Sequence, residues 1–171
     1  NARPTGSNHR QREGVTLVQT VQGSKHRRAH VVTPGGVSLE VAHIGAHQRI
    51  EGHSNAAPHL CFLLEGGVRE RAGYVFVGCG PLGLRLSPAN DSHDLQFGPT
   101  GAKCLLLEID APGVPLPIHR SFHEDQRLAR CALALYEEFL RFEPARPLRI
   151  DELAFELFAG AQRRARPRAA H

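Results

Sequence analysis

Three polar side chains with the chemistry of ligands lie at even intervals in one stretch of the chain. They are His53, Asn55 and His59. On an extended strand, residues separated by even intervals point to the same face of the sheet. A third imidazole, His93, follows a turn at Pro88, far enough along the chain for a neighbouring strand to return beside the first. We therefore predict a ligand pocket formed by His53, Asn55, His59 and His93.

Two kinds of ligand suit these side chains. The neutral imidazoles of His53, His59 and His93 could hold a divalent transition metal such as Zn, Ni or Fe, with Asn55 as a supporting or weak ligand. A site of three protein ligands would leave a position open for water or an effector. Alternatively, the same side chains hydrogen-bond to one another or to a small organic ligand. The sequence leaves both alternatives open and does not identify the cofactor.

Other histidines are weaker candidates. His43 and His47 alternate on the preceding segment and could complete a metal site, but we expect them to be exposed on a strand. His119 and His123 are expected to face solvent.

The four cysteines do not form a C-x-x-C pair, which disfavours a zinc ribbon or a dithiol redox motif. Cys61 and Cys104 lie inside apolar runs, so we expect them to be buried in the core. Together they could also sense oxidants or thiophilic metals, which would require an accessible thiolate. Cys79 lies in a glycine turn and Cys131 on a helix face.

Short strands must position these residues. Apolar residues alternate or cluster in the following segments: 37–42, 60–64, 74–77, 82–86, 93–97 and 104–109. Glycines and prolines separate the segments, and we expect the run at 60–64 to end at Gly66-Gly67. Strands of this length and spacing predict a barrel or sandwich rather than a parallel sheet.

Beyond a linker at 111–117, the apolar spacing becomes helical. Ser121 and Glu124 have the spacing of a capping box, which predicts the start of a first helix. Pro144 and Pro147 are expected to break that helix.

A second helix is expected from about Ile150, with Asp151 and Glu152 in its first turn. The apolar stripe from Ile150 to Ala161 either packs on its own domain or forms a dimer contact.

Composition favours an ordinary globular protein. The chain has 171 residues, 41% hydrophobic and 22% charged, with no apolar run long enough for a membrane span and no signal-peptide pattern. We therefore expect a cytoplasmic protein without a membrane partner. The net charge of +4 resides mainly at the two ends, which indicates solvated tails rather than a phosphate-binding surface.

The motifs resemble those of two related groups. His53, Asn55, His59 and Gly66, followed by Gly83, Pro88 and His93, have the spacing of the cupin metal pattern. Residues 36–165 as a whole resemble the sensor half of AraC-type bacterial transcription regulators: the strand motifs come first, then the segment from Ala134 to Leu157, then an arginine-rich end.

This resemblance implies a mainly β fold: a cupin-like (double-stranded β-helix or jelly-roll) barrel followed by two α-helices. It divides the chain into a flexible basic arm at 1–34, a barrel at 35–112, a helical pair at 113–165 and the start of a linker at 166–171. The linker would lead to a helix-turn-helix DNA-binding domain that is absent here.

The implied function is effector sensing and dimerisation without catalysis. A small molecule or metal ion would bind in the barrel of a homodimer, and DNA would be contacted only through the absent domain. A small metal-dependent cupin enzyme, of the dioxygenase or isomerase type, is the alternative, and an anti-sigma or storage-type metal binder is a third.

Overall fold

The structure, a computed structural model, describes residues 28–109, 119–141 and 147–165. These ranges contain eight strands and two helices. The strands are β1 (Arg28–Val32), β2 (Val37–Ile44), β3 (Arg49–His53), β4 (His59–Ala72), β5 (Val75–Cys79), β6 (Leu84–Ser87), β7 (His93–Ile109) and β8 (Ser121–His123). The helices are α1 (Gln126–Leu140) and α2 (Pro147–Ala165).

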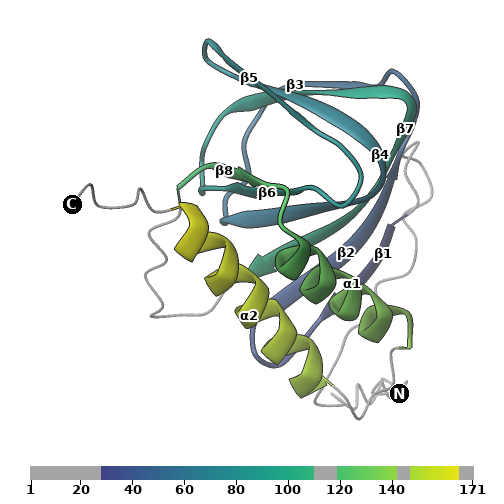
Figure 1. Cartoon of the computed structure of the whole chain (residues 1–171), viewed down its shortest axis with the longest axis vertical. Coiled ribbons are helices and arrows are strands. Elements are labelled where there is room, and N and C mark those ends of the chain that lie inside the picture. Colours follow the sequence, from purple (N-terminus) through teal and green to yellow (C-terminus); the bar gives the residue numbers. More distant parts are fainter. Residues whose placement is uncertain (1–27, 110–118, 142–146, 166–171) are drawn as a thin grey trace, which may run out of the picture.

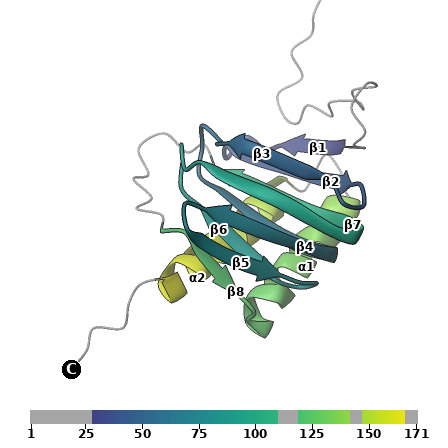
Figure 2. The ribbon, with the colours of Figure 1, turned by 90° about the horizontal axis from the view of Figure 1, so that it is seen from above.

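Two long strands build the barrel. All strand pairs are antiparallel, in the order β1-β2-β7-β4-β6-β8, while β3 pairs with the other half of β7 and β5 with the other half of β4. Because β4 and β7 bend and take part in both halves, the sheet folds over itself, and the two helices lie along its lower outer face (Figures 1 and 2). The predicted fold class, a mainly β barrel followed by two α-helices, is confirmed in this architecture.

Alternation along the strands divides the side chains between two cores. Leu39, Phe62 and Leu107 face the helices and join a cluster with Leu135 and Phe158. The intervening residues face the interior of the barrel, where the second cluster lies; its buried members are Cys61, Leu63, Val68, Cys79, Leu95, Phe97, Ala102 and Cys104. Successive side chains of a strand point to opposite faces, so one sheet supplies both the support for the helices and the wall of the barrel.

Gly66 and Gly101 allow β4 and β7 to bend. Both have positive φ, at 78° and 71°, and a Cβ added at Gly66 would lie 2.0 Å from the carbonyl oxygen of Gly101. The expectation that the strand at 60–64 ends at Gly66-Gly67 is therefore wrong: β4 continues through a bulge to Ala72.

We expect Gly66→Ala to lower the free energy of unfolding by about 1–3 kcal/mol, because the new methyl group meets backbone atoms at a strained φ. Urea unfolding measures the change. Gly78→Ala is the control, since its Cβ would meet nothing within 4 Å; equal losses for the two variants would contradict this role for Gly66.

The start of α1 differs from the predicted capping box. Ser121 lies in the short strand β8, and the N-cap is Asp125, whose side chain accepts hydrogen bonds from the backbone N–H groups of Arg127 and Leu128. An aspartate in an extended N-cap conformation satisfies free amides of the first turn, so the helix begins later than the sequence suggested.

Helix α2 begins at Pro147 rather than near Ile150. Proline suits a first helical turn because its missing N–H has no partner there. Asp151 consequently lies beyond the first turn and accepts a hydrogen bond from the Thr33 hydroxyl, which anchors α2 to the turn after β1.

The predicted stripe of α2 is buried within its own domain. Ile150, Leu153, Ala154, Leu157, Phe158 and Ala161 are each at most 4% exposed. They pack in the helix-facing core, so this stripe is not available for a dimer contact.

The amino-terminal boundary of the barrel also differs from the predicted one. Residues 28–32, predicted to belong to a flexible arm, form strand β1 and pair with β2. Three predicted segments lie outside the described residues: the arm up to residue 27, the linker at 111–117 and the start of the second linker at 166–171. Neither described helix has the length and apolar character needed to span a membrane.

Candidate functional site

A cavity of about 310 Å³ lies inside the barrel. Much of its wall is apolar, formed by Ile44, Ile50, Leu95, Phe97 and Leu106. Polar side chains gather in it as well: Glu40, His53, Asn55, His59, Arg85 and Glu108. An apolar pocket with a few convergent polar groups is the usual form of a small-molecule site.

The four predicted pocket residues come together, but from separate elements. His53 ends β3 and lies opposite His93 at the start of β7, with the two rings 4.2 Å apart between centroids. His59 begins β4, and its ring centroid is 6.1 Å from that of His93. Asn55 lies in the loop between β3 and β4, not on one strand with His53 and His59 as expected.

The loop that carries Asn55 is held in place by backbone and side chain. The Asn90 N–H donates to the carbonyl oxygen of Asn55 at 2.7 Å. The side-chain amide of Asn55 lies 3.2 Å from Nδ1 of His59. This loop therefore forms part of the pocket wall, beside the turn that precedes His93.

Arg85 occupies the centre of the histidine cluster. From β6, its Nη2 donates to Nε2 of His59 at 2.8 Å and to Nε2 of His93 at 2.9 Å, and its Nε donates to the Ser87 hydroxyl at 2.9 Å. Arg85 is only 3% exposed. The site is thus an arginine held by two imidazoles, which sequence inspection did not predict.

The surroundings of His53, His59 and His93 favour the neutral form of each imidazole. Nδ1 of His93 donates to the carbonyl oxygen of Asp91 at 2.8 Å, so its Nε2 carries the lone pair that faces Arg85. Burial, and next the charge of Arg85, lower the pKa of His59 to about 3. The same two causes lower the pKa of His93, and burial followed by the charges of His93 and Arg85 lowers that of His53.

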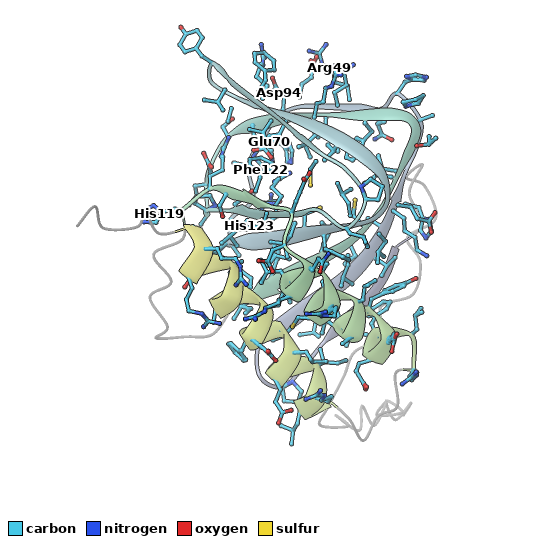
Figure 3. The ribbon with its side chains drawn as sticks, in the orientation of Figure 1. Arg49, Glu70, Asp94, His119, Phe122 and His123 are labelled. Carbon is cyan, nitrogen blue, oxygen red and sulfur yellow. The ribbon has the colours of Figure 1, made fainter. Side chains whose placement is uncertain are left out.

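Glu70 balances the charge of Arg85. Its Oε2 lies 2.8 Å from Nε of Arg85, and its Oε1 lies 3.1 Å from Nη1 of Arg120. Arg120 also pairs with Asp91, at 2.7 Å from Nε to Oδ2. Glu70 is 2% exposed, and in the view of Figure 3 it lies above Phe122 of β8. This buried network joins the two halves of the barrel.

These residues do not fit a bound metal ion. A metal held by His53, His59 and His93 would need imidazole lone pairs, but those on Nε2 of His59 and His93 accept from Arg85. The guanidinium also places a positive charge where a second cation would be repelled. Within the described ranges, no group of three or more His, Cys, Asp or Glu side chains has an arrangement that could hold a metal. The geometry favours the organic-ligand alternative.

Sequence inspection did not predict the two charged residues at the centre of the site, Arg85 and Glu70, and the reasons can be identified. In the segment Leu84-Arg-Leu-Ser87, alternation suggests an apolar inner face and a polar outer face, yet all four residues are buried. The polar face points into the barrel and the apolar face toward the helices. Glu70 lies beyond Gly66-Gly67, where the strand was expected to end, so there was no reason from the sequence to place it in the barrel. The sequence did contain one signal for a buried charge, namely a charged residue in the middle of an apolar strand.

The remaining histidines and cysteines divide as follows. His43, His47 and His119 are exposed, as predicted, but His47 lies in a turn with positive φ rather than on a strand. His123 is half-buried and bonds to the Ser121 hydroxyl, so the expectation that it faces solvent is wrong. Cys61 and Cys104 are buried, at 8% and 1% exposed, as expected.

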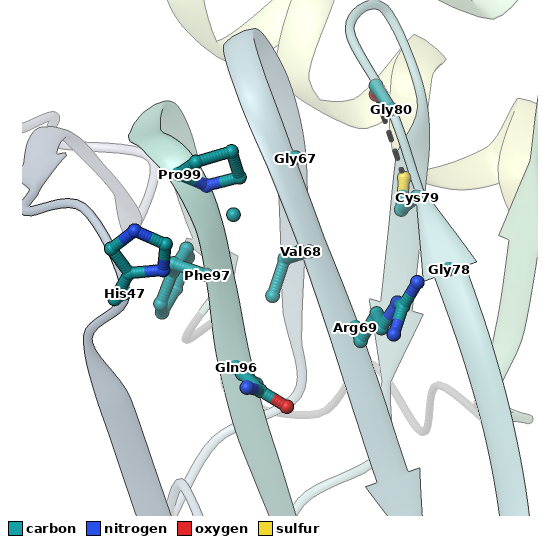
Figure 4. Close-up of a pocket in the computed structure, with 11 residues that line it drawn as sticks. His47, Gly67, Val68, Arg69, Gly78, Cys79, Gly80, Gln96, Phe97 and Pro99 are labelled. Atoms are coloured by element: carbon teal, nitrogen blue, oxygen red, sulfur yellow. Dashed lines mark hydrogen bonds between the residues drawn. The ribbon is translucent and has the colours of Figure 1, made fainter.

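A second hollow, of about 500 Å³, is open to solvent between His47, Val68, Cys79 and Pro99. Its floor is largely backbone, since Gly67, Gly78, Gly80 and Gly98 line it, and Figure 4 shows Arg69 beside Gly78. The Arg69 and Gln96 side chains that border it are exposed. The hollow is larger than the interior cavity but lacks convergent buried polar groups, so the interior cavity is the candidate site.

Comparisons with known proteins give matches in structure only. An oxalate decarboxylase from Bacillus subtilis matches with a TM-score of 0.45 and 15% identity, over 58% of this chain and 28% of that chain. A protein of unknown function from Rhizobium leguminosarum matches with a TM-score of 0.47 and 15% identity, over 52% of this chain and 84% of that chain. Another structure of the Bacillus enzyme, described for its Mn(II) centres, has a TM-score of 0.45.

This chain thus spans under a third of the length of the oxalate decarboxylase chains that it matches. No protein-family model matches the chain, and no curated protein matches it.

Proposed function

We propose that the chain is the ligand-sensing domain of an AraC-type transcription regulator, and that it binds a small organic molecule in the barrel without catalysing a reaction. The observation that carries the proposal is the cavity inside the barrel, which is lined by Arg85, His53, Asn55 and His59. The enzyme alternative gains no support from this site, because the imidazole nitrogens that would bind a metal are engaged by Arg85.

The cavity favours a largely apolar ligand with an oxygen-bearing end. Arg85 is among the residues that line the cavity, so its guanidinium is a hydrogen-bond donor at the cavity wall. A ligand hydroxyl or carbonyl oxygen would accept from it. A neutral ligand fits better than an anion, because Glu70 already balances Arg85 and the Glu40 and Glu108 carboxyls line the same cavity.

A continuous set of contacts joins the pocket to the helices. Arg85 lies opposite Phe122 of β8, and Arg120, which precedes β8, pairs with Glu70. Directly after β8, Asp125 caps α1 and accepts from Nε of Arg164 in the last turn of α2 at 2.8 Å. A ligand that prefers one arrangement of this network would shift α2, which leads to the proposed linker.

The cavity can be tested by filling it. We expect cyclic alcohols and phenols, screened by thermal shift, to raise the melting temperature of the wild-type protein, because a ligand that binds only the folded state stabilises it. Leu106→Trp should abolish the shift, since the indole would occupy the cavity that Leu106 lines.

Leu148→Trp is the matched control, because Leu148 is 75% exposed on α2. It should keep the wild-type response. An unchanged response in Leu106→Trp would place the binding site elsewhere.

The regulatory part of the proposal has a separate test. Reading the gene beyond the codon for His171 should show two helix-turn-helix units in frame, and a stop codon there would overturn it. The homodimer stays a prediction. Its interface must lie away from the buried stripe of α2, and analytical ultracentrifugation measures the mass.

A further inference from the structure

Two cysteines face the cavity on neighbouring strands. Cys61 of β4 and Cys104 of β7 both line it as free thiols. In the antiparallel register, Cys61 lies opposite Leu106 and Cys104 opposite Leu63. Residues directly opposite share a face, so the two cysteines are diagonal neighbours on the inner face. The two thiols thus lie near each other on the cavity wall, where each affects the ionisation of the other.

The surroundings of the two thiols differ. Arg85 is the residue opposite Cys61 on β6, so a fixed positive charge lies beside that sulfur. The hydrogen bond from Cys104, with a smaller contribution from Arg85, lowers the pKa of Cys61, whereas the same bond and burial raise that of Cys104. Burial raises the pKa of Cys79 to about 12. Cys61 is therefore the thiol best suited to act as a nucleophile.

We propose that Cys61 and Cys104 are a redox-active pair, which a hydroperoxide entering the cavity oxidises to an intramolecular disulfide. The Cys61 thiolate attacks one peroxide oxygen, the O–O bond breaks, and the product alkoxide or hydroxide takes up a proton. Cys61 is then a sulfenic acid. The Cys104 sulfur attacks it, a disulfide forms and water leaves. In total, two thiols and one hydroperoxide give a disulfide, an alcohol or water, and a further water.

Oxidation would change the pocket itself. A disulfide fixes its sulfur atoms at about 2 Å, closer than two thiols in contact, and the bond would lie in the wall formed by β4 and β7. We expect the oxidised protein to lose the thermal shift with cyclic alcohols and phenols. This regulatory consequence rests on the proposed function, whereas the thiol chemistry does not.

The test uses hydrogen peroxide on the full chain and on a Cys79→Ser/Cys131→Ser variant that keeps only the pair. We expect the intact mass to fall by two hydrogen atoms and peptide mapping to link Cys61 with Cys104. Cys104→Ser should stop at a sulfenic acid on Cys61 that dimedone traps, and Cys61→Ser should form no disulfide with Cys104. Wild-type peptide mapping gives the same answer if a variant fails to fold.

The inference is overturned if both thiols remain free at a peroxide excess that oxidises exposed thiols, or if the linked peptides do not contain Cys61 and Cys104. Its failure is distinguishable from that of the proposed function. A disulfide without any ligand response would overturn only the ligand-binding proposal, and a ligand response with inert thiols would overturn only the redox pair.

Discussion

Replacing Arg85 with methionine is expected to lower the free energy of unfolding by about 3–5 kcal/mol, because it leaves a buried carboxylate without its nearest counter-charge. Glu70 and Arg85 are 2% and 3% exposed, so the stranded carboxylate would have little access to bulk water. His59 and His93 would also lose the donor to their Nε2 atoms. Urea unfolding followed by circular dichroism measures the change.

Two further variants identify the cause. Arg71→Met removes an ion pair to Asp94 in which the arginine side chain is 51% exposed, and it should cost less than about 1 kcal/mol. Adding Glu70→Gln to Arg85→Met removes the stranded charge, so the double variant should be less destabilised than the sum of the single changes. Strict additivity would show that Glu70 and Arg85 do not act as a pair.

Acidification is expected to destabilise the protein from pH 6.5 downward. The pKa of His59 is about 3 in the folded protein against 6.5 for an ordinary histidine. Between these values the unfolded chain binds a proton that the folded protein excludes, so stability falls as the pH falls. The slope from His59 alone approaches about 1.4 kcal/mol per pH unit. His53, His93 and His123 have lowered pKa values as well and act in the same direction.

Urea unfolding at several pH values measures this slope. His59→Gln should give a shallower slope because the titrating group is gone, whereas His119→Gln should keep the wild-type slope, since His119 is exposed. A wild-type stability that is constant or rises between pH 6.5 and pH 4 would show that His59 is protonated in the folded state.

Local pattern was sufficient for the class of fold but not for the paths of its longest strands. Alternating and clustered apolar residues located parts of β2, β4, β5, β6 and β7, and the later helical spacing located both helices. The sequence did not reveal that β4 continues past Gly66, because glycines also end strands. That continuation depends on the close approach of Gly66 to Gly101, a contact between residues distant in sequence.

For a related reason, only part of the candidate site could be predicted from the sequence. The spacing of His53, Asn55, His59 and His93 indicated a shared pocket, and the structure brings the four together. Arg85 and Glu70 were missed because strand alternation separates two faces without saying which one contacts water. In this barrel the polar face of β6 is the inner one, and only the pairing of β6 with β4 and β8 shows it.

The arginine at the centre of the histidines makes the positive charge of the pocket part of the polypeptide. A chelator cannot extract it, a competing ion cannot exchange with it, and its presence does not depend on the metal supply of the cell. Every folded copy therefore carries the same charge in the same place. A ligand that entered the barrel would therefore meet a positive charge that the fold itself supplies.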